Sequence, residues 1–149
     1  MKNQKNEEQI LSSLSNITEC FEKSIHEFLE HFDIGTAYTF SDEDQLKKQY
    51  LRIYKKFNII LKMHIEKYES EISRISEIVC DADNSCNKER TESLVKHFDS
   101  YMAFSVSVSH FIKNCDTVFL DKEKRFSPHV IENFARKLLV ATQNYKENI

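Results

Sequence analysis

Polar residues that could bind a ligand gather on one helical face near the middle of the chain. His64 is followed one helical turn later by Tyr68. An imidazole and a phenol can both donate hydrogen bonds, and such donors offset the cost of burying an acid head group. Further tyrosines of the same region could serve as donors: Tyr38, Tyr50 and Tyr54. This face therefore indicates an anchor for a carboxylate or another anion. The simpler interpretation is a histidine hydrogen-bonded at the edge of the core.

The spacings of the other chemically reactive residues in the chain do not predict a catalytic site. A di-iron bundle needs Glu/His pairs at i,i+4 on more helices than this chain supplies. Such pairs occur only in the first helical region, as Glu22/His26 and Glu27/His31. Arg90 and His97 have a loose form of the spacing of helical ribonucleases, but no basic run surrounds them. No nucleophile and base stand at a recognisable spacing, and no glycine-rich loop could hold a phosphate. We expect no enzymatic activity.

The segment from Ser41 to Val79 must position His64 and Tyr68. It opens with Ser41-Asp42-Glu43-Asp44, where a hydroxyl cap precedes acids in the first turn of a helix. Its apolar residues then recur in steps of three and four, so the spacing predicts one long amphipathic helix. At about 1.5 Å per residue this helix would exceed 50 Å, and we expect a bend or a break in it. The paired lysines Lys47-Lys48 and Lys55-Lys56 are interpreted as a solvated face.

Three further helical regions are predicted around this segment. Residues 5–32 carry an apolar stripe, and residues 88–120 form another helical region with an expected break near Asp99. Ser127 and Pro128 then give the cap and first position of a final helix. With one Gly and one Pro among 149 residues, the chain is predicted to be an all-α single domain spanning residues 1–149.

The bulk composition narrows the functional classes. The formal net charge of −3 and the lack of a long basic run argue against nucleic-acid binding. No apolar run is long enough to cross a membrane, so we expect no membrane insertion and a cytoplasmic location. In a reducing compartment the four cysteines are mostly free thiols, although Cys80 and Cys86 could pair.

Several short stretches resemble those of globins. Phe40 and Thr36 resemble the corner that packs on haem, and His64 falls near the distal position. The remaining matches are Leu94-Val95-Lys96-His97, which resembles the proximal stretch, and Phe126-Ser127-Pro128, Phe134, Lys137-Leu138-Leu139 and Tyr145, which resemble the last globin helix. The resemblance covers nearly the whole chain and implies a globin-like fold.

Two departures from this pattern bear on haem. Haem globins keep a small aliphatic one turn after the distal histidine, and Tyr68 stands there. If Phe98 takes the inward position of the proximal segment, His97 points sideways and cannot ligate iron. A globin fold filled by aromatics resembles the non-haem globin sensor domains of Bacillus, including stand-alone sporulation-inhibitory proteins. That family implies a fatty acid in an apolar tunnel, a chloride or other halide nearby, and a homodimer.

The leading hypothesis is a non-haem sensor module that binds a fatty acid and modulates a histidine-kinase pathway of sporulation. The expected ligand-binding residues are His64, Tyr68, Phe40, Phe57, Leu61, Leu94, Phe98 and Phe28. No metal or cofactor is expected in this interpretation. One alternative is a haem globin that binds O2 or NO through His97, and another is a helical interaction protein without an internal ligand. For a homodimer, we expect an interface on the third and fourth helical regions, around Ile112 and Phe119.

Overall fold

The computed structural model of the chain describes residues 2–32, 43–82, 88–123 and 125–149. It contains four helices: α1 (Lys2–Glu30), α2 (Glu43–Ala82), α3 (Lys88–Leu120) and α4 (Pro128–Asn148). No strand occurs among the residues described, so the all-α prediction is confirmed. The predicted third region, residues 88–120, has the same bounds as α3.

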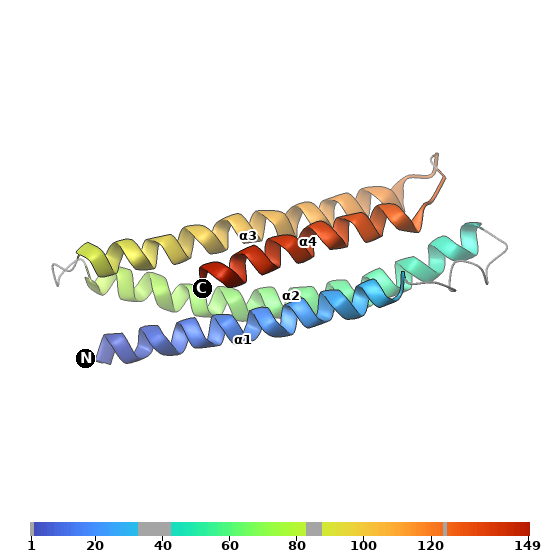
Figure 1. Ribbon diagram of the computed structural model, residues 1–149. Helices are drawn as coiled ribbons and strands as arrows, with labels where there is room; N and C mark the ends of the chain where they lie inside the picture. Colours follow the sequence, from blue (N-terminus) through green and yellow to red (C-terminus); the bar gives the residue numbers. More distant parts are fainter. Residues whose placement is uncertain (1, 33–42, 83–87, 124) are drawn as a thin grey trace.

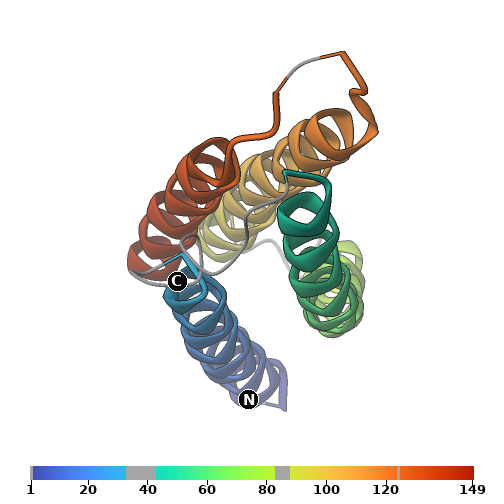
Figure 2. The same ribbon diagram turned by 90° about the vertical axis from the view of Figure 1, so that its right-hand side faces the viewer.

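The four helices form an elongated up-and-down bundle. In Figure 1, α1 and α3 run in one direction along the bundle, and α2 and α4 return in the other. α1 packs against α2 and α4, and α3 packs against the same two helices, so each helix has antiparallel neighbours. The view along the bundle shows this cyclic order of the four helices (Figure 2). The globin-like arrangement implied by the resemblance is not confirmed by this architecture.

The breaks expected in the two longest helices do not occur. α2 runs without a break for 40 residues and α3 for 33. Neither contains a Gly or Pro, and the apolar residues of each recur along its whole length. Each long helix therefore packs against long neighbours without any position that favours a kink. Apolar and polar residues alternate from Phe104 to Phe111, a pattern that is also typical of strands, but this segment lies inside α3 and packs against helices.

The starts of α2 and α4 show the predicted signals, whereas α1 begins and ends two to three residues earlier than the predicted 5–32 and α2 ends at Ala82, past the predicted Val79. Ser127 occupies the N-cap of α4 in an extended conformation and Pro128 follows at the first helical position, but the serine side chain makes no capping hydrogen bond. Glu43 and Asp44 lie in the first turn of α2, as expected. The predicted cap Ser41 and one half of the Cys80–Cys86 pair lie outside the described residues.

The core follows the predicted apolar stripes and draws on all four helices. The most deeply buried side chains are Ile10, Leu14, Thr18, Phe21, Ile25, Leu61, Tyr68, Ile75, Leu94, Ile131, Leu138 and Thr142. Aromatic residues fill much of the space between the helices. Phe119, one of the two expected dimer contacts, is buried in this core, whereas Ile112 is only half-buried. Phe119 is thus a core residue of the single chain.

Candidate functional site

His64 lies on α2, half-buried, with its ring against α1. Its Nδ1 lies 2.8 Å from the carbonyl oxygen of Ile60, one turn earlier, and therefore donates to it. The imidazole also meets the edge of Phe21, with ring centroids 5.5 Å apart. One of the two ring nitrogens is consequently engaged within the helix.

Tyr68 is fully buried, and its hydroxyl is used inside the core. The phenol donates to the hydroxyl oxygen of Thr18 at 2.8 Å, and that hydroxyl donates to the carbonyl of Leu14 at 2.6 Å. Burial raises the pKa of Tyr68 well above its usual range, although the hydrogen bond with Thr18 opposes the rise. The side chain is thus a neutral structural link between α2 and α1.

Around Tyr68 the aromatic side chains form a cross-section of the bundle that we call the tyrosine layer. It consists of Phe21, Tyr68, Tyr101, Phe104 and Tyr145, which come from all four helices and contact one another at centroid distances of 4.8–6.4 Å. Burial raises the pKa of Tyr101 to about 12. The buried hydroxyl of Tyr145 has no hydrogen-bond partner among the described residues. The rings of all five residues pack against one another, so the hydroxyl of Tyr145 is the buried polar group of the layer that lacks a partner among the described residues.

The two histidines of the haem alternative lie on different levels of the bundle. Tyr68 contacts Tyr101, with centroids 5.5 Å apart. His64 precedes Tyr68 by one turn and His97 precedes Tyr101 by one turn. Because α2 and α3 are antiparallel, the histidines diverge from this contact by eight residues in total, roughly 12 Å along the bundle axis. Burial lowers the pKa of His97, and the charge of Glu7 opposes this shift.

The remaining predicted residues lie in three different places. Leu94 is a fully buried core residue of α3, and Phe40 falls outside the described residues. Leu61 and Phe98 border a hollow between α2 and α3. Phe28 and Phe57 meet in a second hollow, between α1 and α2. The structure therefore brings the predicted residues together in pairs, and no single cavity contains them all.

The hollow between α1 and α2, which we call the α1–α2 pocket, has a volume of about 450 Å³. Its floor is the pair Phe28 and Phe57, whose rings stack with centroids 4.4 Å apart and planes 15° from parallel. Ile53 is half-buried and Ile60 is 38% exposed, and both add apolar surface to the walls. A cavity of this size with an apolar floor is within the range of small-molecule sites.

The rim of the α1–α2 pocket is predominantly basic. Arg52 and Lys56 are four residues apart and share one face of α2. Neither side chain forms a hydrogen bond or ion pair with the part of the chain that the structure describes. The other lining residues are Ser24, Glu27, His31 and Gln49. Among the described residues, the pocket thus combines an aromatic floor with two cations that have no hydrogen-bond or ion-pair partner and with one carboxylate, Glu27.

The hollow between α2 and α3, the α2–α3 groove, is larger and has a different character. Its volume is about 700 Å³, and its floor is mainly aliphatic. The apolar lining residues are Leu61, Ile65, Ile72, Phe98, Tyr101, Met102, Val108 and Ile112. Two carboxylates, Glu66 and Glu69, stand on its α2 side, and serines line much of the rest. This rim is acidic where that of the α1–α2 pocket is basic.

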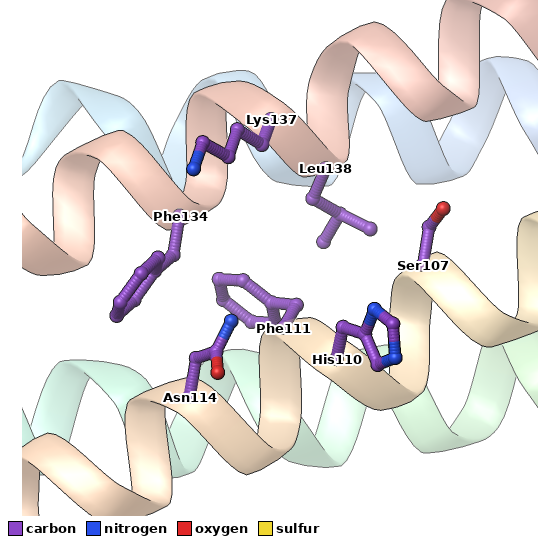
Figure 3. A pocket seen from close by; sticks show the side chains of 7 residues that line it. All are labelled: Ser107, His110, Phe111, Asn114, Phe134, Lys137 and Leu138. Carbon is purple, nitrogen blue, oxygen red and sulfur yellow. The ribbon is translucent and has the colours of Figure 1, made fainter.

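A third hollow lies between α3 and α4 and is smaller, at about 280 Å³. Figure 3 shows Phe111 and Leu138 facing each other across it, with Phe134 beside Phe111 and Lys137 above. Phe111 and Leu138 are both core residues, so the apolar surface here is already packed. We consider it the weakest of the three candidates because it falls below the usual volume of a ligand site.

Sequence reasoning missed the two cations of the α1–α2 pocket. The paired lysines predict a solvated face for Lys56, and no sequence motif marks Arg52. The available signal was their i,i+4 spacing next to Phe57, which places cations and an aromatic on adjoining faces of one helix. Spacing alone does not show which helix packs beside that face, so the pocket itself could not be predicted.

Comparison with known proteins does not assign the chain to a family. No family model matches it, and searches of curated proteins and of solved structures found no match. Among the described residues, no three His, Cys, Asp or Glu side chains come together as a metal site. Within the same residues, no helix has an apolar stretch of the length needed to cross a membrane.

Proposed function

We propose that this chain is a non-enzymatic binding module that holds an anionic amphiphile, of the fatty-acid class, in the α1–α2 pocket. The observation that supports this most directly is the pair of cations, Arg52 and Lys56, which have no partner in the described part of the chain and lie beside the stacked floor of Phe28 and Phe57. The carboxylate would lie between the cations, and the acyl chain would lie over the rings. Compared with the sequence hypothesis, the head-group partners change from His64 and Tyr68 to Arg52 and Lys56.

The energetics of such a complex are favourable in both of its parts. Each methylene removed from water contributes about 0.8 kcal/mol, and the Phe28–Phe57 floor with Ile53 and Ile60 supplies the apolar surface. Arg52 can form two parallel hydrogen bonds with a carboxylate, and Lys56 adds a point charge. Two like charges at i,i+4 repel by a few tenths of a kcal/mol, and a bound anion relieves that repulsion.

A regulatory role is the natural use of such a module. A ligand changes the behaviour of a protein only if it favours one packing over another. Here the ligand would contact α1 and α2 together and thereby change how tightly these two helices pair. Consistent with the resemblance to sporulation sensor domains, the occupied module would modulate a sensor-kinase pathway, for example by competing for the same fatty acid.

Calorimetric titration of the delipidated full chain with dodecanoate tests the proposal. We expect the double variant Arg52→Gln/Lys56→Gln to bind at least about tenfold more weakly than wild type, a difference of roughly 1.4 kcal/mol. The matched control is Lys48→Gln/Lys55→Gln, which removes two exposed cations of the same helix that do not line the pocket. The control should bind like wild type. Equal losses in both double variants, or no binding by wild type, would refute the proposal.

A further inference from the structure

The α2–α3 groove exposes apolar surface that the bundle itself does not cover. Ile65, Phe98 and Ile112 are only half-buried, and Met102 is 46% exposed. On α2 the groove extends from Leu61 to Ser76, which corresponds to about 22 Å at the helical rise. This is a length of about four helical turns.

The charges along the groove are distributed unevenly. Glu66 and Glu69 stand on the α2 rim, are exposed, and form no ion pair within the described part of the chain. The α3 rim carries Ser105 and Ser109 and has no positive charge to balance the two glutamates. On the α2 side, Lys62 lies near one end of the groove. An occupant with positive charges on its flank would therefore be favoured, and a carboxylate lying along the groove would be opposed.

From these features we infer that the α2–α3 groove is the docking surface for a cationic amphipathic helix of a partner protein. A helix laid along two antiparallel helices buries an apolar face at i, i+3, i+4 and i+7 and keeps its basic residues at the rim. Met102 can adapt its side chain to the anchors of such a helix, because methionine is flexible and polarisable. The acidic rim of the groove makes this occupant distinct from the anionic amphiphile of the α1–α2 pocket.

A designed peptide tests the inference on the full chain. The probe is a fluorescent peptide of about eighteen residues in which leucines follow the i, i+3, i+4, i+7 pattern and lysines fill the other positions. A second peptide carries glutamate in place of every lysine. Fluorescence anisotropy should show binding of the lysine peptide to wild type and at least about tenfold weaker binding of the glutamate peptide.

Charge reversal then shows where the peptide binds. The variant Glu66→Lys/Glu69→Lys should weaken binding of the lysine peptide at least about tenfold, whereas Glu8→Lys/Glu19→Lys on α1 should leave it unchanged. All four residues are exposed, so both variants should keep the fold and the helical circular dichroism of wild type. Equal losses in the two variants would overturn the inference, because they would show attraction to net charge alone.

Two other occupants of the groove would give different results. If the groove binds a second copy of the chain, sedimentation should show a wild-type dimer that the exposed substitution Met102→Glu converts to a monomer. If it binds an amphiphile, dodecanoate should displace the lysine peptide from the Arg52→Gln/Lys56→Gln variant. Either result would overturn the inference of a partner helix and would leave the α1–α2 pocket to its own test.

Discussion

The two halves of α2 border hollows of opposite character. Residues 49–60 contribute to the α1–α2 pocket, which has a stacked aromatic floor and a basic rim. Residues 61–76 contribute to the α2–α3 groove, which has a mainly aliphatic floor and an acidic rim. The apolar spacing is the same in both halves. The comparison shows that the same hydrophobic periodicity borders both hollows, while the charges beside the stripe make one rim basic and the other acidic.

The tyrosine of the second half and the cations of the first half differ in where their polar atoms lie. In the second half, Tyr68 turns into the core and bonds Thr18, so it cannot readily serve a ligand. In the first half, Arg52 and Lys56 remain at the surface without partners in the described structure. The groups with spare hydrogen-bonding capacity are therefore the charged ones at the rim.

The largest expected effects are losses of stability and of dodecanoate binding, and they distinguish the floor of the α1–α2 pocket from that of the α2–α3 groove. Phe57→Ala should destabilise the chain by about 3–5 kcal/mol and also abolish most dodecanoate binding, because it removes half of the stacked pair. Leu61→Ala, in the floor of the groove, should cost about 2–5 kcal/mol but leave dodecanoate binding intact. Urea unfolding and calorimetric titration measure the two quantities, and Phe57→Leu provides a milder variant. Loss of dodecanoate binding in Leu61→Ala alone would reverse the assignment of the two hollows.

A smaller effect concerns the hydroxyls behind the groove. Tyr68→Phe removes a buried hydrogen bond and should lower the free energy of unfolding by about 1 kcal/mol. Tyr145→Phe removes a buried hydroxyl that has no partner among the described residues, so stability should stay unchanged or rise. Urea midpoints at unchanged m-values compare the two substitutions directly. A larger loss of stability in Tyr145→Phe than in Tyr68→Phe would mean that the Tyr145 hydroxyl forms a hydrogen bond of its own.

The smallest expected effect is a pH dependence near the end of the groove. Burial lowers the pKa of His97 below the value of about 6.5 typical of the unfolded chain. The unfolded state therefore takes up the proton first, and stability falls as the pH drops below about 6.5. His97→Gln should reduce this fall between pH 7.5 and 5. The other five histidines are present in both proteins, so parallel stability curves would contradict the assignment to His97.

Much of the fold could be predicted because it depends on local signals. The apolar stripes, the Ser127-Pro128 start of α4 and the bounds of α3 all follow from neighbouring residues in the chain. The continuity of α2 could not be predicted, because it depends on long partner helices that cover its stripe from end to end. The α1–α2 stacking of Phe28 and Phe57 depends in the same way on which helices become neighbours.

The lysines show the same limit at the level of single residues. Lys47, assigned by its sequence to a solvated face, donates to the carbonyl oxygen of Asp121 at 2.9 Å and so joins the start of α2 to the end of α3. Lys56 borders a pocket. Spacing assigns such residues to a face of their own helix, but only the packing of the other helices shows what that face meets.

The most direct test of the central claim is an amide chemical-shift titration of the 15N-labelled, delipidated chain with dodecanoate. We predict that the largest shifts fall in residues 24–31 and 49–60, which border the basic rim and the stacked floor. Residues 98–112 of α3 should stay close to their starting positions. Shifts concentrated instead in residues 61–76 and 98–112 would place the ligand in the acidic α2–α3 groove and contradict the account.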